Sequence, residues 1–373
     1  MEMTDPYAAT NLQYLRPADV RRIRDQCPVA YIPVGAIEWH GEHLPLGVDA
    51  LISYGLVSRA VVATGGVVLP ATHVSCGLLN FPLSLNYHQR VLEHNIRDTL
   101  EQVRKEGFRC IIVLTGHGPM DQIHTLKVAC ADLMAKHPDC RAFGLCWFEL
   151  LVDSGEELIL DHAAKVETSL MQALWPRLVD LSKLSDDPEE TPLGVYGKNP
   201  KFTASPAWGR RIVDHFVKNL GARVRAMLAG GPVDNYADLR GFVAAHWNKP
   251  LQFAGGYRAT KNGLEFDLHN DSGYSRYISA VAQLQVDGQD VPAKNVTFRN
   301  LNHGEGRCER ADRLSPLRGF YIRRFQSGTL EIRGLPSGGE AHRVRLRLQL
   351  AGVAESTLEE TLVPQPAQES APR

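Results

Sequence analysis

Apolar residues in the first two thirds of the chain form short continuous runs that alternate with longer segments of helical spacing. Continuous apolar runs are typical of strands buried on both faces, and they occur at 28–34, 66–70, 109–114 and 141–148. Helical spacing predicts helices at 49–63, 88–106 and 123–136. Strands separated by helices of this length need crossover connections, so we expect an α/β fold with a mostly parallel sheet and helices on both faces.

The pattern changes after the Gly-Gly-Pro sequence at 230–232. From residue 250 onward, apolar and polar residues alternate in short runs that turn signals such as Asn262-Gly263 separate. These runs predict an antiparallel β-sandwich with strands at 264–268, 278–286, 329–332 and 344–350. We therefore expect an α/β domain at 1–233, a linker at 234–249, a β-sandwich domain at 250–363 and a flexible tail at 364–373.

The composition is that of an ordinary globular protein, with 373 residues of which 44% are apolar and 22% charged. The net charge of -1 and the lack of a basic stripe argue against a nucleic-acid partner. No apolar stretch approaches the ~18 residues of a membrane span, and the first residues do not resemble a signal peptide. The seven cysteines form no CxxC pair, which is typical of free thiols in a reducing compartment. We expect a cytoplasmic protein that has no membrane partner.

Candidate chemistry begins in the polar loop that follows the predicted strand at 28–34. Glu38 and His40 are two residues apart, so extended backbone directs both side chains the same way, and Asp49 opens the next predicted helix. Loops at the carboxyl end of parallel strands hold the ligand sites of open α/β folds. Carboxylate and imidazole groups together suit divalent zinc, manganese or iron. Each residue alone has a simpler interpretation: a solvated loop glutamate, or an aspartate that caps a helix.

Two further segments carry candidate groups. His117 lies between two glycines after the strand at 109–114, so it leaves the sheet at the same edge as Glu38. His162 and Glu167 lie near the first turns of a predicted helix, where the helix dipole favours an anion or a ligand oxygen. Taken alone, this last pair would be interpreted as a capping histidine and a surface glutamate.

Three motifs in this order resemble the creatininase (creatinine amidohydrolase) family. They are Glu-x-His-Gly-x-His-Leu-Pro-x-x-x-Asp at 38–49, Gly-His-Gly at 116–118 and His-Ala-x-x-x-Glu-Thr-Ser at 162–169. The resemblance covers roughly residues 28–230 and includes the glycine-bearing segments at 194–197 and 204–209. It implies a metal-dependent hydrolase that acts on a small-molecule substrate and assembles as a homo-oligomer, commonly a hexamer.

The resemblance also implies roles for particular residues. Glu38, Asp49 and His117 would hold one divalent ion (Zn, Mn or Fe). His40 and Asp49 would hold a second, so that Asp49 bridges the pair. The acid that completes this second site in creatininase is replaced by Pro119, and Glu167 is the best substitute. His162 matches the histidine that handles protons near the substrate. His43 and Gly118 would support the metal ligands or contact the substrate.

Several departures from the family pattern argue for a substrate other than creatinine. The usual Phe-Pro-Gly-Thr is Phe81-Pro82-Leu83-Ser84, and the histidine before it is missing from 78–80. The aromatic residue beside the metal histidine is Gly118, and the Trp–Asp pair before the later histidine is Leu158-Ile159.

We expect the chain to hydrolyse a cyclic amide or a related non-peptide C–N bond through metal-activated water. The added β-sandwich leaves open an alternative, the ring-opening C–C hydrolysis of a cyclic diketone such as an inosose-type sugar derivative. A non-catalytic sugar-binding or scaffold protein is a third possibility from a different class.

Overall fold

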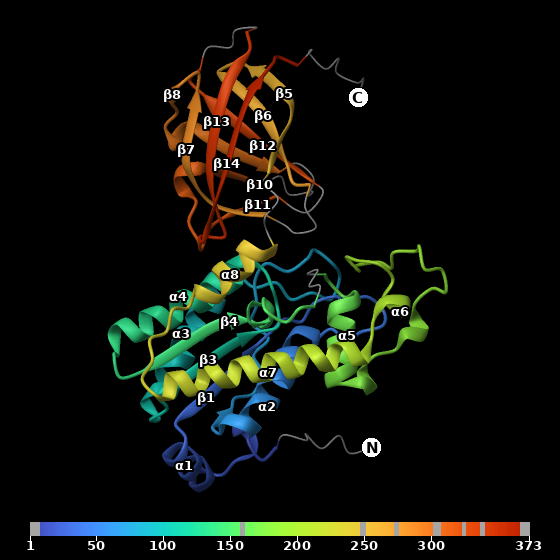
Figure 1. The fold of residues 1–373 in the computed structure, drawn as a ribbon, viewed down its shortest axis with the longest axis vertical. Coiled ribbons are helices and arrows are strands. Elements are labelled where there is room, and N and C mark those ends of the chain that lie inside the picture. The colour runs from blue at the N-terminus through green and yellow to red at the C-terminus, as the bar shows by residue number, and fades with distance from the viewer. Residues whose placement is uncertain are drawn as a thin grey trace. The chain divides into compact units, whose positions relative to one another are not determined.

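The computed structural model describes residues 8–156, 161–246, 251–271, 276–300, 307–322, 326–335 and 340–365 (Figure 1). Two compact units divide the chain, Met1–Phe242 and Val243–Arg373. They are called the N-terminal unit and the C-terminal unit below.

The N-terminal unit is built on a four-stranded parallel sheet with the strand order β2-β1-β3-β4. Its strands are β1 (Val29–Val34), β2 (Val67–Val68), β3 (Cys110–Thr115) and β4 (Arg141–Cys146). Its α-helices are α1 (Pro17–Gln26), α2 (Val48–Thr64), α3 (Gln89–Lys105), α4 (Met120–Lys136), α5 (Lys165–Leu174), α6 (Pro200–Thr203) and α7 (Pro206–Leu228), and α8 (Ala237–His246) begins in this unit and ends beyond its boundary at Phe242. The predicted α/β class is confirmed.

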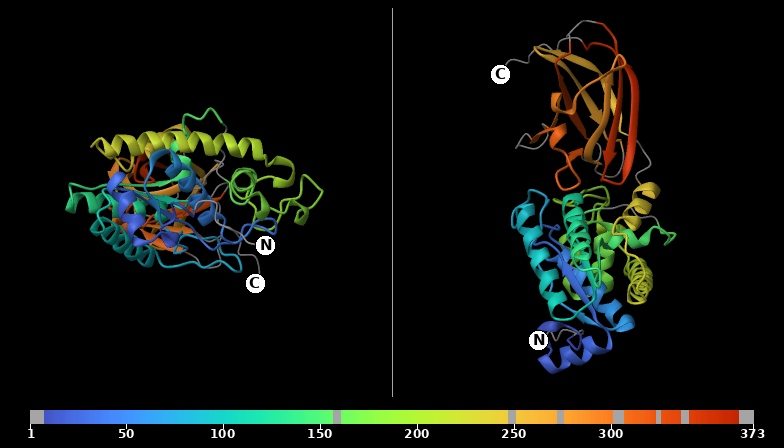
Figure 2. Two further views of the ribbon diagram at one scale, coloured as in Figure 1. Left: turned by 90° about the horizontal axis from the view of Figure 1, so that it is seen from below. Right: turned by 90° about the vertical axis from the view of Figure 1, so that its left-hand side faces the viewer.

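Helices cover both faces of this sheet, as the continuous apolar strands require (Figure 2). One layer consists of α3 and α4, whose apolar faces form a core with β1 and β3. On the other side α2 packs against β1, and α7 packs on both α2 and α5. The chain therefore leaves β1 towards one face of the sheet and leaves β3 towards the other.

A polar network protects the free edge of β4. The side-chain amide of Asn235 accepts a hydrogen bond from Gly144 N at 2.7 Å and donates one to Ala142 O at 3.2 Å, as a neighbouring strand would. Lys127, fully buried on α4, donates to Glu149 Oε2 at 2.6 Å and to the carbonyl oxygens of Gly144 and Asn235. These bonds attach the segment around Asn235 to the sheet. The expected linker at 234–249 thus contains part of the packed fold, including α8.

The C-terminal unit consists of two antiparallel sheets, as predicted. One has the order β10-β9-β12-β6-β5 and the other β11-β7-β13-β14, with β8 paired to β7. Apolar residues from both sheets, among them Phe266, Phe298, Leu330 and Leu346, form one core between them. The strands are β5 (Gln252–Thr260), β6 (Gly263–His269), β7 (Arg276–Val286), β8 (Gln289–Asp290), β9 (Val296–Asn300), β10 (Arg307–Arg310), β11 (Phe320–Ile322), β12 (Ser327–Arg333), β13 (His342–Leu350) and β14 (Ala354–Leu362).

The start of the expected tail is ordered by β5. Tyr257 N donates to Val363 O at 2.9 Å, and Gln365 N donates to Tyr257 O at 2.8 Å. Residues 366–373, together with the family departure at Leu158-Ile159, lie outside the described part of the chain. Among the described residues, no helix is both long and apolar enough to cross a membrane.

The Lys127–Glu149 pair gives a first testable prediction. Lys127→Met leaves the Glu149 carboxylate fully buried without its cation, which costs about 3–5 kcal/mol. Chemical denaturation should show this loss in the transition of the N-terminal unit. The double variant Lys127→Met/Glu149→Gln removes the unpaired charge and should recover much of the stability. Equal stability of the wild type and the single variant would contradict the structural role of the pair.

Candidate metal centre

The candidate site lies where the strand order turns back, between β1 and β3. In a sheet with the order β2-β1-β3-β4, the loops after β1 and β3 diverge to opposite faces and leave a crevice at the carboxyl edge. Glu38 and His40 follow β1, and His117 follows β3, so the crevice collects all three side chains. Asp49, the second residue of α2, enters it from the helix that follows the first loop.

Two glycines let the beginning of α2 approach the sheet. A Cβ atom on Gly35 would lie 2.1 Å from Ala50 N, and a Cβ atom on Gly116 would lie 2.0 Å from Asp49 O. Any side chain at either position would overlap the helix backbone. The glycines after β1 and β3 thus set how closely Asp49 approaches the carboxyl edge of the sheet.

Three side chains form the first ligand group: Glu38, Asp49 and His117. His117 Nδ1 lies 3.2 Å from Glu38 Oε2 and 3.1 Å from Asp49 Oδ2. The other oxygen of Glu38 accepts a hydrogen bond from Leu79 N at 2.6 Å, which orients the carboxylate so that Oε2 faces the group. Glu38 and Asp49 are fully buried, and His117 is almost so.

The second ligand group contains His40, Asp49 and Glu167. His40 Nε2 lies 3.6 Å from Asp49 Oδ1 and 3.5 Å from Glu167 Oε2. His40 Nδ1 donates to Glu38 O at 3.0 Å, because a carbonyl oxygen can only accept, so in the neutral ring the lone pair is on Nε2, which faces the carboxylates. Asp49 belongs to both groups and directs one oxygen to each.

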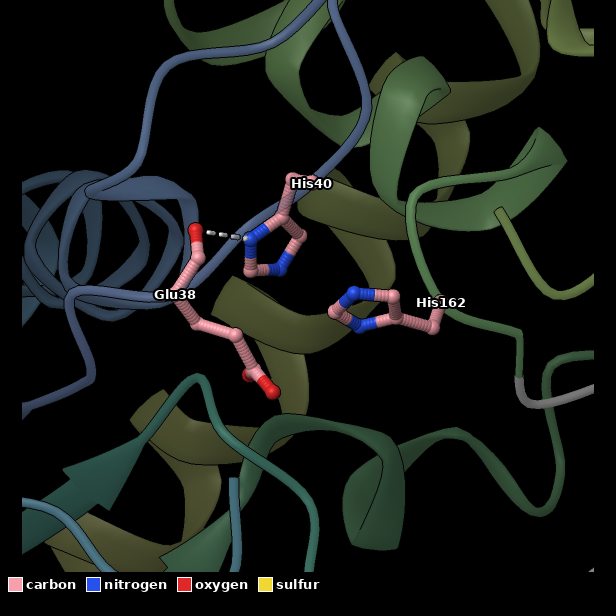
Figure 3. A group of neighbouring side chains, drawn as sticks. All are labelled: Glu38, His40 and His162. Carbon is pink, nitrogen blue, oxygen red and sulfur yellow. Dashed lines mark hydrogen bonds between the residues drawn. The ribbon is translucent and has the colours of Figure 1, made fainter. Parts of the chain in front are cut away.

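His162 lies beside Glu38 and His40, one residue from each ligand group (Figure 3). Its Nε2 donates to Trp39 O at 2.7 Å, so the lone pair of the neutral ring is on Nδ1, which lies 4.0 Å from Glu167 Oε2. The centroids of the His162 and His40 rings are 4.3 Å apart. His162 also forms a third possible ligand group with Glu38 and His40.

The buried atoms of the centre fit divalent cations. Within the described chain, Glu38 Oε2, His40 Nε2 and Asp49 Oδ2 are buried without a hydrogen-bond partner. A buried polar atom without a partner is costly, and a shared cation would satisfy the carboxylate and imidazole atoms that converge here. The donor set, with three carboxylates and two imidazoles, is one that zinc, manganese or iron accepts.

Electrostatics in the centre favour added positive charge. Burial alone would lower the pKa of His40, but the surrounding carboxylates, Asp49 foremost, together outweigh burial and raise that pKa to about 9. Glu38 and Asp49 likewise hold the pKa of the buried His117 well above its ordinary value. Burial raises the pKa of Glu167 to about 8, despite the opposing charge of His40. Protons therefore offset the carboxylate charges here, and metal binding would displace them.

Comparison with known proteins identifies the family. The sequence model described as "Creatininase: creatinine amidohydrolase" matches residues 13–224, more than half of the chain. The chain belongs to the creatininase family. Family membership confirms the predicted resemblance and the predicted hydrolase class. The creatinine amidohydrolase of Pseudomonas putida is 28% identical over an alignment of 200 residues, and the match covers 48% of this chain and 77% of that protein.

Solved creatininase structures share the fold of the N-terminal unit. A crystal structure of creatinine amidohydrolase aligns with a TM-score of 0.51 at 23% identity, over 60% of this chain and 99% of that one. A manganese creatininase gives a TM-score of 0.51 at 23% identity and covers 58% of this chain and 98% of its own. A creatininase variant of the Zn-Zn type, 22% identical, gives a TM-score of 0.50 over the same shares of the two chains.

The structure places the remaining predicted residues around the ligand groups. His43 Nε2 hydrogen-bonds to Thr168 Oγ1 at 3.0 Å, and burial lowers the pKa of His43 to about 4, so the ring is neutral. Gly118 is exposed. The roles assigned to these two residues within the creatininase site stay predictions. His162 precedes α5 rather than lying in its first turns, and its backbone pairs with that of Tyr196.

Sequence reasoning missed the groups that orient the ligands. Trp39 O holds His162, and Leu79 N holds Glu38, but both act through the backbone and carry no side-chain signal. Asp161 accepts from Val166 N at 2.7 Å and so fixes the start of α5 and the position of Glu167. An aspartate just ahead of a predicted helix is a recognisable capping signal that could have identified it.

The glycines on either side of His117 give a matched test of the geometry. Gly116→Ala would drive its methyl group into Asp49 O, so we expect zinc affinity, measured by chelator competition, to fall about 10- to 100-fold. Gly118→Ala is the control because its methyl group would meet only Phe148 Cε1, at 3.4 Å. Equal zinc affinity of the two variants would contradict the role of Gly116 in placing Asp49.

Proposed function

We propose that the chain is a metal-dependent hydrolase that opens a cyclic amide or a related non-peptide C–N bond. The observation that carries this proposal is the pair of buried ligand groups that share Asp49, with the neutral His162 beside them. Paired metals with a bridging carboxylate suit hydrolysis. The matched relatives, named creatinine amidohydrolases, support the same reaction class.

Each ligand group would hold one divalent ion. Glu38, Asp49 and His117 provide the first set, while His40, Asp49 and Glu167 provide the second. The ions would supply Lewis acidity and an activated water at neutral pH. Glu167 takes the place of the acid that the family carries at the position of Pro119, which has no donor atom and caps α4 instead. The carboxylates offset the charge of two cations brought close together.

His162 is placed to move a proton during ring opening. Its Nε2–H is committed to Trp39 O, so Nδ1 is the atom available for exchange. Burial, together with the neighbouring His40, lowers the pKa of His162 to about 4, which keeps the ring neutral and able to accept a proton. Nδ1 would take a proton from the attacking water and pass it to the leaving nitrogen. Hydrolysis of a lactam gives one open-chain product that carries both a carboxylate and an amine.

A substrate screen tests the reaction class directly. The zinc- or manganese-loaded protein should open lactams or cyclic ureas, with one new amine per turnover. Inosose-type diketones serve as the competing class, because their opening breaks a C–C bond and releases no amine. Turnover of diketones alone would replace the C–N proposal. A purified protein without a stoichiometric amount of metal would favour the non-catalytic scaffold protein.

Asp49→Asn should remove metal and activity together. The amide keeps the shape of the side chain but loses the negative charge that both ligand groups share. The metal content, measured by elemental analysis, and the turnover rate should therefore fall in parallel. Asp214→Asn, an exposed aspartate on α7, is the matched control and should change neither. Full metal content with wild-type turnover in Asp49→Asn would reject the bridging role.

His162→Ala should keep the metal and lose turnover. Removal of a general acid/base typically lowers turnover by ~10²–10⁴-fold. Elemental analysis of the same sample distinguishes this role from the third ligand group, in which His162 joins Glu38 and His40. Collapse of metal content in His162→Ala would show that His162 is a ligand.

A further inference from the structure

Three largely exposed apolar side chains lie on segments that are hydrogen-bonded to Glu38 and Trp39 at the candidate centre. Leu83, Leu85 and Leu193 are 64%, 51% and 72% exposed. Single exposed leucines are ordinary on protein surfaces, but these come from two segments that meet at one residue, Trp39. We refer to Trp39, Leu83, Leu85 and Leu193 as the apolar lip.

Hydrogen bonds connect the lip to the catalytic groups. Trp39 O accepts from His162, Trp39 N donates to Ser84 Oγ at 3.1 Å, and Leu85 N donates to Ile37 O at 2.9 Å. The same segment begins at Leu79, whose N–H binds the Glu38 carboxylate. Residues 79–85 therefore run from the first ligand group to the neighbourhood of His162.

The second segment of the lip is fixed on the indole of Trp39. Trp39 Nε1 donates to Leu193 O at 3.1 Å. A Cβ atom on Gly194, which has φ +75°, would lie 2.4 Å from the indole and 3.6 Å from the ring of Phe81. Only glycine permits this approach, so the chain holds the indole and the Phe81 ring against one backbone position.

Leu83 adopts a backbone conformation that its own packing does not explain. Its φ of +61° is in the left-handed region, which costs roughly 1–2 kcal/mol for a residue with a Cβ. Such residues cluster at ligand clamps, where surrounding structure holds them for a function. Leu83 is 64% exposed, so a molecule bound over it would add contacts that the chain itself does not provide.

We propose that the apolar lip binds an apolar substituent of the substrate, next to the bond that is hydrolysed. The inference rests on the proposed function, because it takes that substrate to be a cyclic amide. The substituent, an alkyl or aromatic group on the ring, would cover Leu83 and Leu193 while the amide reaches the metal centre. Continuity of the lip with Glu38 and His162 favours a substrate over a second copy of the chain as the occupant.

The test compares two cyclic amides that differ only in one substituent, hydantoin and 5-benzylhydantoin. Calorimetric titration of the zinc-loaded protein should show at least about tenfold tighter binding of the benzyl compound, since a hydrophobic contact of this size discriminates on that scale. Leu83→Gly should lose about tenfold in affinity for 5-benzylhydantoin and retain its affinity for hydantoin. Leu228→Ala, at an exposed leucine on α7, is the control and should bind both compounds like the wild type.

Stability distinguishes this role from a structural one. Glycine adopts φ +61° without strain, so the melting temperature of Leu83→Gly should be equal to or above that of the wild type. Equal binding of the two compounds, or no binding of either, would contradict the proposal that the apolar lip binds a substituent of the substrate. A Leu83→Gly variant that changes only its sedimentation would assign the surface to a second copy instead. Tighter binding of 5-benzylhydantoin without turnover of either compound would support the lip and reject the proposed C–N hydrolysis.

Discussion

The candidate centre depends on the close approach of α2 to the carboxyl edge of the sheet. Asp49 can belong to two ligand groups only because glycines after β1 and β3 let the helix backbone reach the sheet. The strand order provides the crevice, since β1 and β3 are neighbours whose following segments cross to opposite faces. The two glycines then fix the distance between the start of α2 and the sheet. The remaining ligands are added from the loop after β1, the loop after β3 and the start of α5.

The N-terminal unit contains two kinds of buried carboxylate, and the contrast between them is informative. Glu149 is fully buried, but Lys127 and the amide of Cys146 satisfy it. Glu38 and Asp49 are buried to the same degree, yet no lysine or arginine side chain forms an ion pair with them in the described chain. Buried charge without a protein cation is expensive, so the second arrangement is stable only when protons or metal ions supply the balance.

Much of this arrangement could be predicted from sequence because strong local signals coincide with it. Continuous apolar runs predict β1, β3 and β4, and polar motifs after β1 and β3 indicate Glu38, His40 and His117 as candidate ligands. The substitution of Glu167 for the acid at Pro119 was a prediction from the resemblance, and the structure brings Glu167 to His40 and Asp49. What could not be predicted acts through the backbone or over long range. Trp39 O, the strained Leu83 and the edge-capping Asn235 depend on contacts between segments far apart in the chain.

The most direct test of the account is anomalous X-ray diffraction from crystals of the zinc- or manganese-loaded protein. The account predicts two metal peaks at the edge of the parallel sheet, with Asp49 between them. Glu38 and His117 should coordinate one ion, and His40 and Glu167 the other. A single peak without Glu167 as a ligand, or no peak near Asp49, would contradict the proposal of a bridged pair of ions in this chain.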